Sequence, residues 1–172
     1  MYKNILVATD GSPIGNRAVI AGASLASALD ADLTLVTVVG QGDVSEHMVR
    51  TFEVEHLIEE RNPEDITMVG SAPVPLVRSS SDASLAAKVH QAMAETIMHN
   101  ALEEASALVT RKPTNLIAEG DPAEVILDLA ARNHHDLIVI GSRGFGELKS
   151  LFLGSVSSKV NQLAECPCLI IK

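Results

Sequence analysis

Two glycine-containing segments near the C-terminal end of the chain have residue types that could bind phosphate. They are residues 141–144, with the sequence GSRG, and, after nine intervening residues, 154–157, with the sequence GSVS. Glycine lets backbone N–H groups approach phosphate oxygens because no Cβ atom stands in the way. The free N–H groups and the dipole of a helix that starts after Gly154 would also favour an anion. The spacing therefore predicts a polyphosphate site, and the alternative is a tight strand-to-helix turn followed by a capping serine.

Short apolar runs that alternate with helical patterns indicate which elements would position these glycines. The runs that predict buried strands are 5–8, 33–39, 114–118, 137–140 and 168–171. Amphipathic helices are predicted over 16–29, 82–110, 123–132 and 154–164. This alternation predicts an α/β fold, a doubly wound parallel sheet with right-handed crossovers. Such sheets bind ligands beyond the carboxyl ends of their strands, where the strand order reverses.

The composition fits a single domain over residues 1–172 in a protein that is not embedded in a membrane. The chain has 172 residues, 47% hydrophobic and only 2% aromatic, so its core must consist of Val, Ile, Leu and Ala. A net charge of −9 would repel a phosphate backbone, which argues against a nucleic-acid partner. No apolar run approaches the roughly 20 residues of a membrane helix, and the first residues resemble a strand rather than a signal peptide. We therefore expect a cytoplasmic protein with no membrane partner.

Residues 41–81 are the part of the chain least like a compact fold. The stretch 41–66 is acidic, and the stretch 70–81 is rich in Pro and Ser. We predict a solvated insertion, and the alternative is a lid that binds a partner. Asp82 is the candidate N-cap of the long helix that follows.

The cysteines and histidines do not form a recognisable metal set. Cys166 and Cys168 are separated by a single proline, which makes a poor disulfide, and no matched pair of histidines accompanies them as in a zinc site. We therefore predict no metal-ligating side chains.

The glycine pattern resembles the nucleotide-binding motif of the ATP-binding branch of the universal stress protein family. Residues 3–12 (KNILVATDGS) are similar to the first strand and turn of that family, and residues 120–123 (GDPA) to a later turn. Residues 136–157 and 166–171 resemble its C-terminal half. Together these segments cover most of the chain outside about residues 41–81, where the chain is longer than is usual for the family.

This resemblance implies an adenine nucleotide alpha hydrolase-like fold, with a five-stranded sheet of order 3-2-1-4-5. It also implies a bound ATP, with Mg²⁺ carried by the triphosphate, and a homodimer in which the final strand pairs with its twofold mate. Asp10 would face the ribose or the adenine, and the backbone near Val38 would meet the adenine. Residues 141–144 would wrap the ribose and phosphates, and residues 154–157 would bind the β- and γ-phosphates. The predicted cofactor-binding residues are Ala8, Thr9, Asp10, Val38, Ile140, Gly141, Ser142, Arg143, Gly144, Gly154, Ser155, Val156 and Ser157.

Two of these residues have alternative roles. Asp10 stands in an Asp-Gly-Ser-Pro sequence, where its carboxylate could instead form an Asx-turn. Arg143 could pair with a phosphate or remain a solvated surface arginine.

Three functions are compatible with these residues. The first is a nucleotide-dependent regulatory module in a stress response, whose state a protein partner would read. The second is a slow ATPase, which would need a group that positions water near the γ-phosphate, where the motif offers only serines and glycines. The third is an interaction protein whose glycine loop binds nothing, and the intact glycine spacing argues against it.

Overall fold

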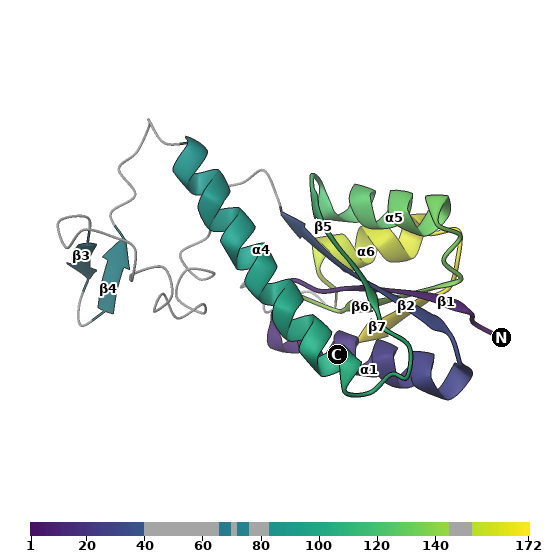
Figure 1. Ribbon diagram of the computed structural model, residues 1–172. Coiled ribbons are helices and arrows are strands. Elements are labelled where there is room, and N and C mark those ends of the chain that lie inside the picture. Colours follow the sequence, from purple (N-terminus) through teal and green to yellow (C-terminus); the bar gives the residue numbers. More distant parts are fainter. Residues whose placement is uncertain (40–65, 70–71, 76–82, 145–152) are drawn as a thin grey trace. The chain divides into compact units, whose positions relative to one another are not determined.

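Figure 1 shows the computed structural model, which describes residues 1–39, 66–69, 72–75, 83–144 and 153–172. Contacts divide the chain into two compact units, one formed by Met1–Gly42 with Gln91–Lys172 and the other by Asp43–His90. The predicted insertion at 41–81 falls mainly in the second unit, and most of it lies outside the described residues, as does the candidate N-cap Asp82. The predicted phosphate-binding residues all belong to the first unit.

The first unit is built on one parallel sheet. Its strands are β1 (Asn4–Ala8), β2 (Asp32–Val39), β5 (Thr114–Glu119), β6 (Leu137–Gly141) and β7 (Cys168–Ile171). They lie in the order β5-β2-β1-β6-β7, and every neighbouring pair is parallel. Numbered among themselves, these strands have the order 3-2-1-4-5, so the predicted fold is confirmed. The order reverses between β1 and β6, because the chain runs outward from β1 to β5 before it returns beside β1.

Helices cover both faces of this sheet (Figure 1). They are α1 (Pro13–Leu29), α4 (Ala83–Ser106), α5 (Pro122–Arg132) and α6 (Ser155–Leu163). α1 and the C-terminal part of α4 pack on one face, and α5 and α6 pack on the other. Among the helices in the described ranges, none is both long and apolar enough to cross a membrane.

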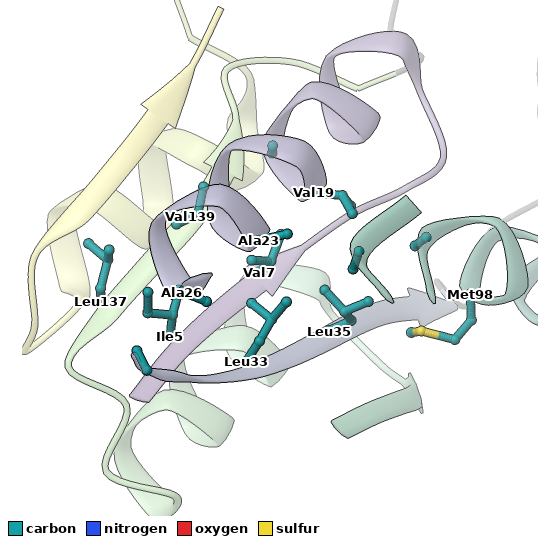
Figure 2. Close-up of a cluster of buried hydrophobic side chains, with 14 residues drawn as sticks. Ile5, Val7, Val19, Ala23, Ala26, Leu33, Leu35, Met98, Leu137 and Val139 are labelled. Carbon is teal, nitrogen blue, oxygen red and sulfur yellow. The ribbon is translucent and has the colours of Figure 1, made fainter. Parts of the chain in front are cut away.

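The alternation of side chains along β1 explains why this strand reads as a continuous apolar run. Ile5 and Val7 pack into the cluster on the α1 side, whereas Leu6 and Ala8 pack into the cluster on the α5 side. Figure 2 shows the first cluster, in which Val7 lies against α1. A strand buried on both faces has no polar side to alternate with, so composition alone was enough to find it.

The second unit contains a hairpin that the sequence analysis did not predict. β3 (Ile66–Val69) pairs with β4 (Ala72–Pro75) in an antiparallel ladder. Pro73 and Pro75 suggested a loop because proline cannot donate a ladder hydrogen bond. Proline is nevertheless tolerated on edge strands, and both strands of a two-stranded hairpin are edges.

The helix ends that differ most from the prediction are the start of α1 and the end of α4. α1 begins at Pro13 rather than at residue 16, because the Ser12 hydroxyl caps the helix by accepting a hydrogen bond from Gly15 N–H at 3.0 Å. Proline at the first helical position suits this start, since its missing N–H would have no helical partner there. α4 ends at Ser106 rather than at residue 110, and a last bond from Val109 N–H to Ala105 O follows it.

His135 lies buried at the end of α5, in the turn that leads into β6. Its side chain is only 6% exposed, its Nδ1 lies 3.3 Å from Leu129 O, and its Nε2 has no hydrogen-bond partner among the described residues. Burial lowers the pKa of His135, and this effect outweighs the Leu129 carbonyl and the nearby Asp136 carboxylate, which both raise it. Folding therefore favours the neutral form of this imidazole.

We expect His135 to make the protein less stable as the pH falls. The His135 imidazole of the unfolded chain has a pKa of about 6.5, which is higher than its pKa in the folded protein. Below that pH the unfolded chain takes up the proton first, so the free energy of unfolding decreases by at most about 1.4 kcal/mol per pH unit until the folded pKa is passed. Urea denaturation at about pH 7 and about pH 5.5 should show a smaller decrease for His135→Gln than for the wild type. Equal decreases would contradict this assignment.

Candidate functional site

The predicted site residues gather at the carboxyl ends of β1 and β6, on either side of the point where the strand order reverses. Ala8 and Ile140 are register partners across these strands, and both side chains are buried in the α5-side cluster. Val38, the last residue but one of the neighbouring β2, lies near the carboxyl end of that strand and is partly buried. The structure thus brings the predicted residues of β1, β2 and β6 together at the carboxyl ends of these strands, although they are far apart in the sequence.

The turn after β1 is held by two side chains that bond to its own backbone. Thr9 Oγ1 accepts a hydrogen bond from Gly11 N–H at 3.2 Å, and Asp10 Oδ1 accepts one from Ser12 N–H at 3.0 Å. The second bond is the Asx-turn that the sequence offered as an alternative role for Asp10. Gly11 has a φ of 78°, a left-handed conformation that glycine adopts without strain. Asp10 is partly exposed, and among the described residues only its Oδ1 takes part in this turn.

The loop after β6 leaves the sheet through Ser142. Ser142 N–H donates to Ile171 O of β7 at 2.6 Å, and the Ser142 side chain is 3% exposed. The carbonyl of Ser142 accepts two hydrogen bonds from α6, one from Gly154 N–H at 2.7 Å and one from the Ser157 hydroxyl at 2.9 Å. Arg143 and Gly144, which follow, are exposed. The two glycine segments of the sequence are therefore joined through a single peptide group.

The start of α6 differs from the starts of α1 and α5. A side chain closes each of those two helices, since Ser12 Oγ accepts from Gly15 N–H in α1 and Asp121 Oδ1 accepts from Glu124 N–H in α5. In α6 the N-cap is Gly154, and no cap side chain accepts a hydrogen bond from its first turn. The first N–H groups of a helix have no helical partners, so this end presents positive partial charge at the reversal point. Ser155, the first helical residue, is exposed there.

Close approaches explain why several positions in these loops are glycine. A Cβ atom on Gly144 would overlap Asp10 Oδ2, so the loops after β1 and β6 touch at this point. A Cβ on Gly141 would lie 3.1 Å from the Ile14 side chain. A Cβ on Gly15 would lie 2.7 Å from Asp10 Oδ1 and 2.9 Å from Thr9 Oγ1. The sequence analysis did not select Gly15. The signal that could have found it is a glycine directly before the predicted helix 16–29, in the turn that follows a predicted strand.

We expect Gly144→Ala to destabilise the protein by about 1 kcal/mol, because the new methyl group displaces the Asp10 carboxylate from its bond to Ser12 N–H. Asp10→Ala removes the carboxylate, so adding Gly144→Ala to that variant should cost much less. A double-mutant cycle of denaturation free energies measures this coupling. Additive effects would show that the two loops do not meet as described.

Charged side chains fix α6 to α5 on the outer surface. Lys159 Nζ lies 3.2 Å from Asp121 Oδ1 and 3.1 Å from Glu124 Oε1. The N–H of Glu124 and the Lys159 ammonium lower the pKa of Asp121, and Glu124 and Asp121 raise the pKa of Lys159. Within the described ranges, no group of three or more His, Cys, Asp or Glu side chains gathers to hold a metal ion. Lys159, Asp121 and Glu124 therefore connect α6 to the start of α5.

The family relationship follows from a match along the whole chain. The model of the universal stress protein family matches residues 1–172. The chain belongs to the universal stress protein family. Among relatives in this family, the universal stress protein YxiE of Bacillus subtilis (strain 168) is 33% identical over 175 residues, which cover 100% of both chains.

Solved structures of universal stress proteins share this fold. UspA from Lactobacillus plantarum has a TM-score of 0.69 at 21% identity, covering 99% of this chain and 98% of that one. A universal stress protein in complex with cAMP has a TM-score of 0.64 at 22% identity, covering 99% of this chain and 97% of that one. Membership of the family rests on the match over the entire chain, and the likeness to these solved structures shows the fold.

Proposed function

We propose that this protein binds ATP with the phosphates at the open start of α6 and the nucleoside toward β1 and β2. The observation that carries this proposal is the contrast among helix starts, since side chains cap α1 and α5 but not α6. The main-chain N–H groups of residues 155–157 and the exposed Ser155 hydroxyl would bind the β- and γ-phosphates. Hydrogen bonds to charged groups contribute about 1.5–3 kcal/mol each, so a few of them suffice without a lysine.

The remaining site residues would hold the rest of the nucleotide. Residues 141–144 would wrap the ribose and α-phosphate through the main chain of this loop, in which Arg143 and Gly144 are exposed. Asp10 Oδ2 would accept a hydrogen bond from a ribose hydroxyl or the adenine amino group, while Oδ1 keeps the Asx-turn. The backbone of Val38, at the same edge of the sheet, would meet the adenine. The structural relative in complex with cAMP supports an adenine nucleotide as the class of ligand.

We propose that Mg²⁺ arrives with the triphosphate instead of occupying a site formed by the protein. Within the described residues no acidic cluster is present to hold it, and Mg²⁺ in nucleotide sites is bound largely by phosphate oxygens and water. Asp10 lies in the turn after β1, where we propose that the nucleoside binds, so we do not assign it as a metal ligand.

We propose further that the protein acts in the cytoplasm as a homodimeric regulatory module, pairing β7 with its twofold mate. β7 lies at the end of the sheet, and its four residues, Cys168–Ile171, are all partly exposed. Unpaired backbone groups at a sheet edge favour pairing with another strand. Because Ser142 N–H bonds to Ile171 O, the proposed dimer strand is directly connected to the nucleotide loop. A protein partner would then read the occupied dimer.

Identification of the nucleotide released from freshly purified protein tests this proposal. We expect heat-released supernatant to contain an adenine nucleotide, with ATP predominant, and we expect phosphate release from added ATP to stay near the background of a Gly154→Val control. Steady release well above that background would favour the slow ATPase. Protein that neither releases nor binds an adenine nucleotide would contradict the proposal and favour a purely protein-binding function.

A further inference from the structure

The Ser157 hydroxyl is turned into the protein, away from the solvent that a phosphate would replace. Its residue is only 2% exposed. The hydroxyl lies 2.9 Å from Ser142 O, fifteen residues away in sequence, and 3.1 Å from Gly154 O. A hydroxyl has a single proton to donate, and these two carbonyls already share it. Direct donation to a phosphate would require this proton to leave both of them.

The carbonyl of Ser142 is the centre of this arrangement. It accepts from Gly154 N–H and from the Ser157 hydroxyl, at 2.7 and 2.9 Å. A carbonyl oxygen has two lone pairs, so both are used by α6. A Cβ on Gly154 would lie 3.3 Å from the same oxygen and 3.7 Å from Ser157 Oγ, which shows how closely these groups pack. The first turn of α6 is thereby fixed to the end of β6.

This arrangement holds the start of α6 without a capping side chain on its N–H groups. In α1 the Ser12 hydroxyl oxygen accepts the hydrogen bond of Gly15 N–H, and in α5 the Asp121 carboxylate accepts the hydrogen bond of Glu124 N–H. In α6 the serine stands at the third helical position and donates backward to carbonyls. The helix start is therefore anchored while no cap side chain occupies its first amides.

We propose that Ser157 is a positioning residue that locks the first turn of α6 onto the Ser142 carbonyl and so aims the free N–H groups at the phosphates, without its hydroxyl touching them. This inference rests on the proposed nucleotide binding and assigns the Ser157 hydroxyl a different role from that of Ser155. Without the lock, ATP must order the turn as it binds, and that ordering lowers the affinity.

Three variants separate positioning from direct contact. Ser157→Ala removes the lock, Ser157→Thr retains a hydroxyl, and Ser155→Ala is the matched control that removes an exposed hydroxyl from the same turn. Amide hydrogen exchange is measured on each protein without nucleotide, and the dissociation constant for ATP is measured by calorimetry. Thermal unfolding confirms that each variant folds cooperatively.

We expect Ser157→Ala to speed exchange at Gly154 and Ser158 in the nucleotide-free protein and to weaken ATP binding about three- to tenfold, the effect of one neutral hydrogen bond. Ser157→Thr should restore both properties. Ser155→Ala should weaken ATP binding while leaving nucleotide-free exchange at Gly154 unchanged.

Unchanged exchange in nucleotide-free Ser157→Ala would overturn the inference, and so would faster exchange with unchanged ATP affinity. If the wild type binds no adenine nucleotide, the proposed function fails, and the aiming of amides at phosphates fails with it. In that case the exchange measurement still decides whether the lock exists.

Discussion

Gly154→Val should weaken ATP binding by at least about 100-fold, equivalent to about 2.7 kcal/mol. A Cβ at this position would lie 3.3 Å from Ser142 O and 3.5 Å from Arg143 Cα, so valine's two further methyl groups must cover the free amides or push α6 away from the β6 loop. Loss of one or two hydrogen bonds to a charged phosphate accounts for this magnitude. Calorimetric titration with ATP measures it.

The effect of this substitution should come from side-chain volume and not from backbone strain. Gly154 has φ of −71° and ψ of 164°, a conformation that any residue adopts. Gly154→Ala is therefore the matched control, and we expect it to fold normally and to lose about tenfold or less in affinity. Wild-type affinity in the valine variant would show that the phosphates bind elsewhere.

Gly22→Ala should reduce the free energy of unfolding by about 2 kcal/mol or more, although alanine favours helices over glycine by about 1 kcal/mol. A Cβ on Gly22 would overlap Val7 Cγ2, and Val7 is completely buried beneath α1 (Figure 2). Interiors are packed densely enough that one extra methyl group forces neighbours to move. Denaturant unfolding measures the loss.

A compensating substitution tests the physical reason for that loss. Val7→Ala creates space where the new methyl group would lie, so the Gly22→Ala/Val7→Ala pair should be more stable than the sum of the single effects predicts. Strict additivity would contradict a direct clash between α1 and β1. The contact matters for the site because α1 begins at the turn that holds Asp10.

Local sequence was sufficient to predict the strands of the first unit and their parallel pairing, whereas the strand order came from the family resemblance. β1 and β6 are buried on both faces, so they appear as short uninterrupted apolar runs, and the helices between them require parallel pairing. The β3–β4 hairpin could not be predicted in this way, because its prolines carry a loop signal that an edge strand tolerates. Nothing in its own composition distinguishes the two outcomes.

The candidate site, like the fold, has features that the sequence reveals and features that it does not. The glycine loops could be selected as a candidate site because backbone N–H groups near a helix start need small neighbours if they are to bind phosphate, which leaves a pattern in the sequence. The orientation of the Ser157 hydroxyl could not, because it depends on a carbonyl that lies fifteen residues away. Nor could the contact of Gly144 with Asp10, which requires the loops after β1 and β6 to meet in space.

A heteronuclear NMR titration with ATP tests the central claim most directly, because it reports on each backbone amide separately. The account predicts the largest shift changes at the amides of Ser155, Val156 and Ser157, with smaller changes at Gly144 and around Asp10. Large changes confined to other parts of the chain, or none at saturating ATP, would contradict it.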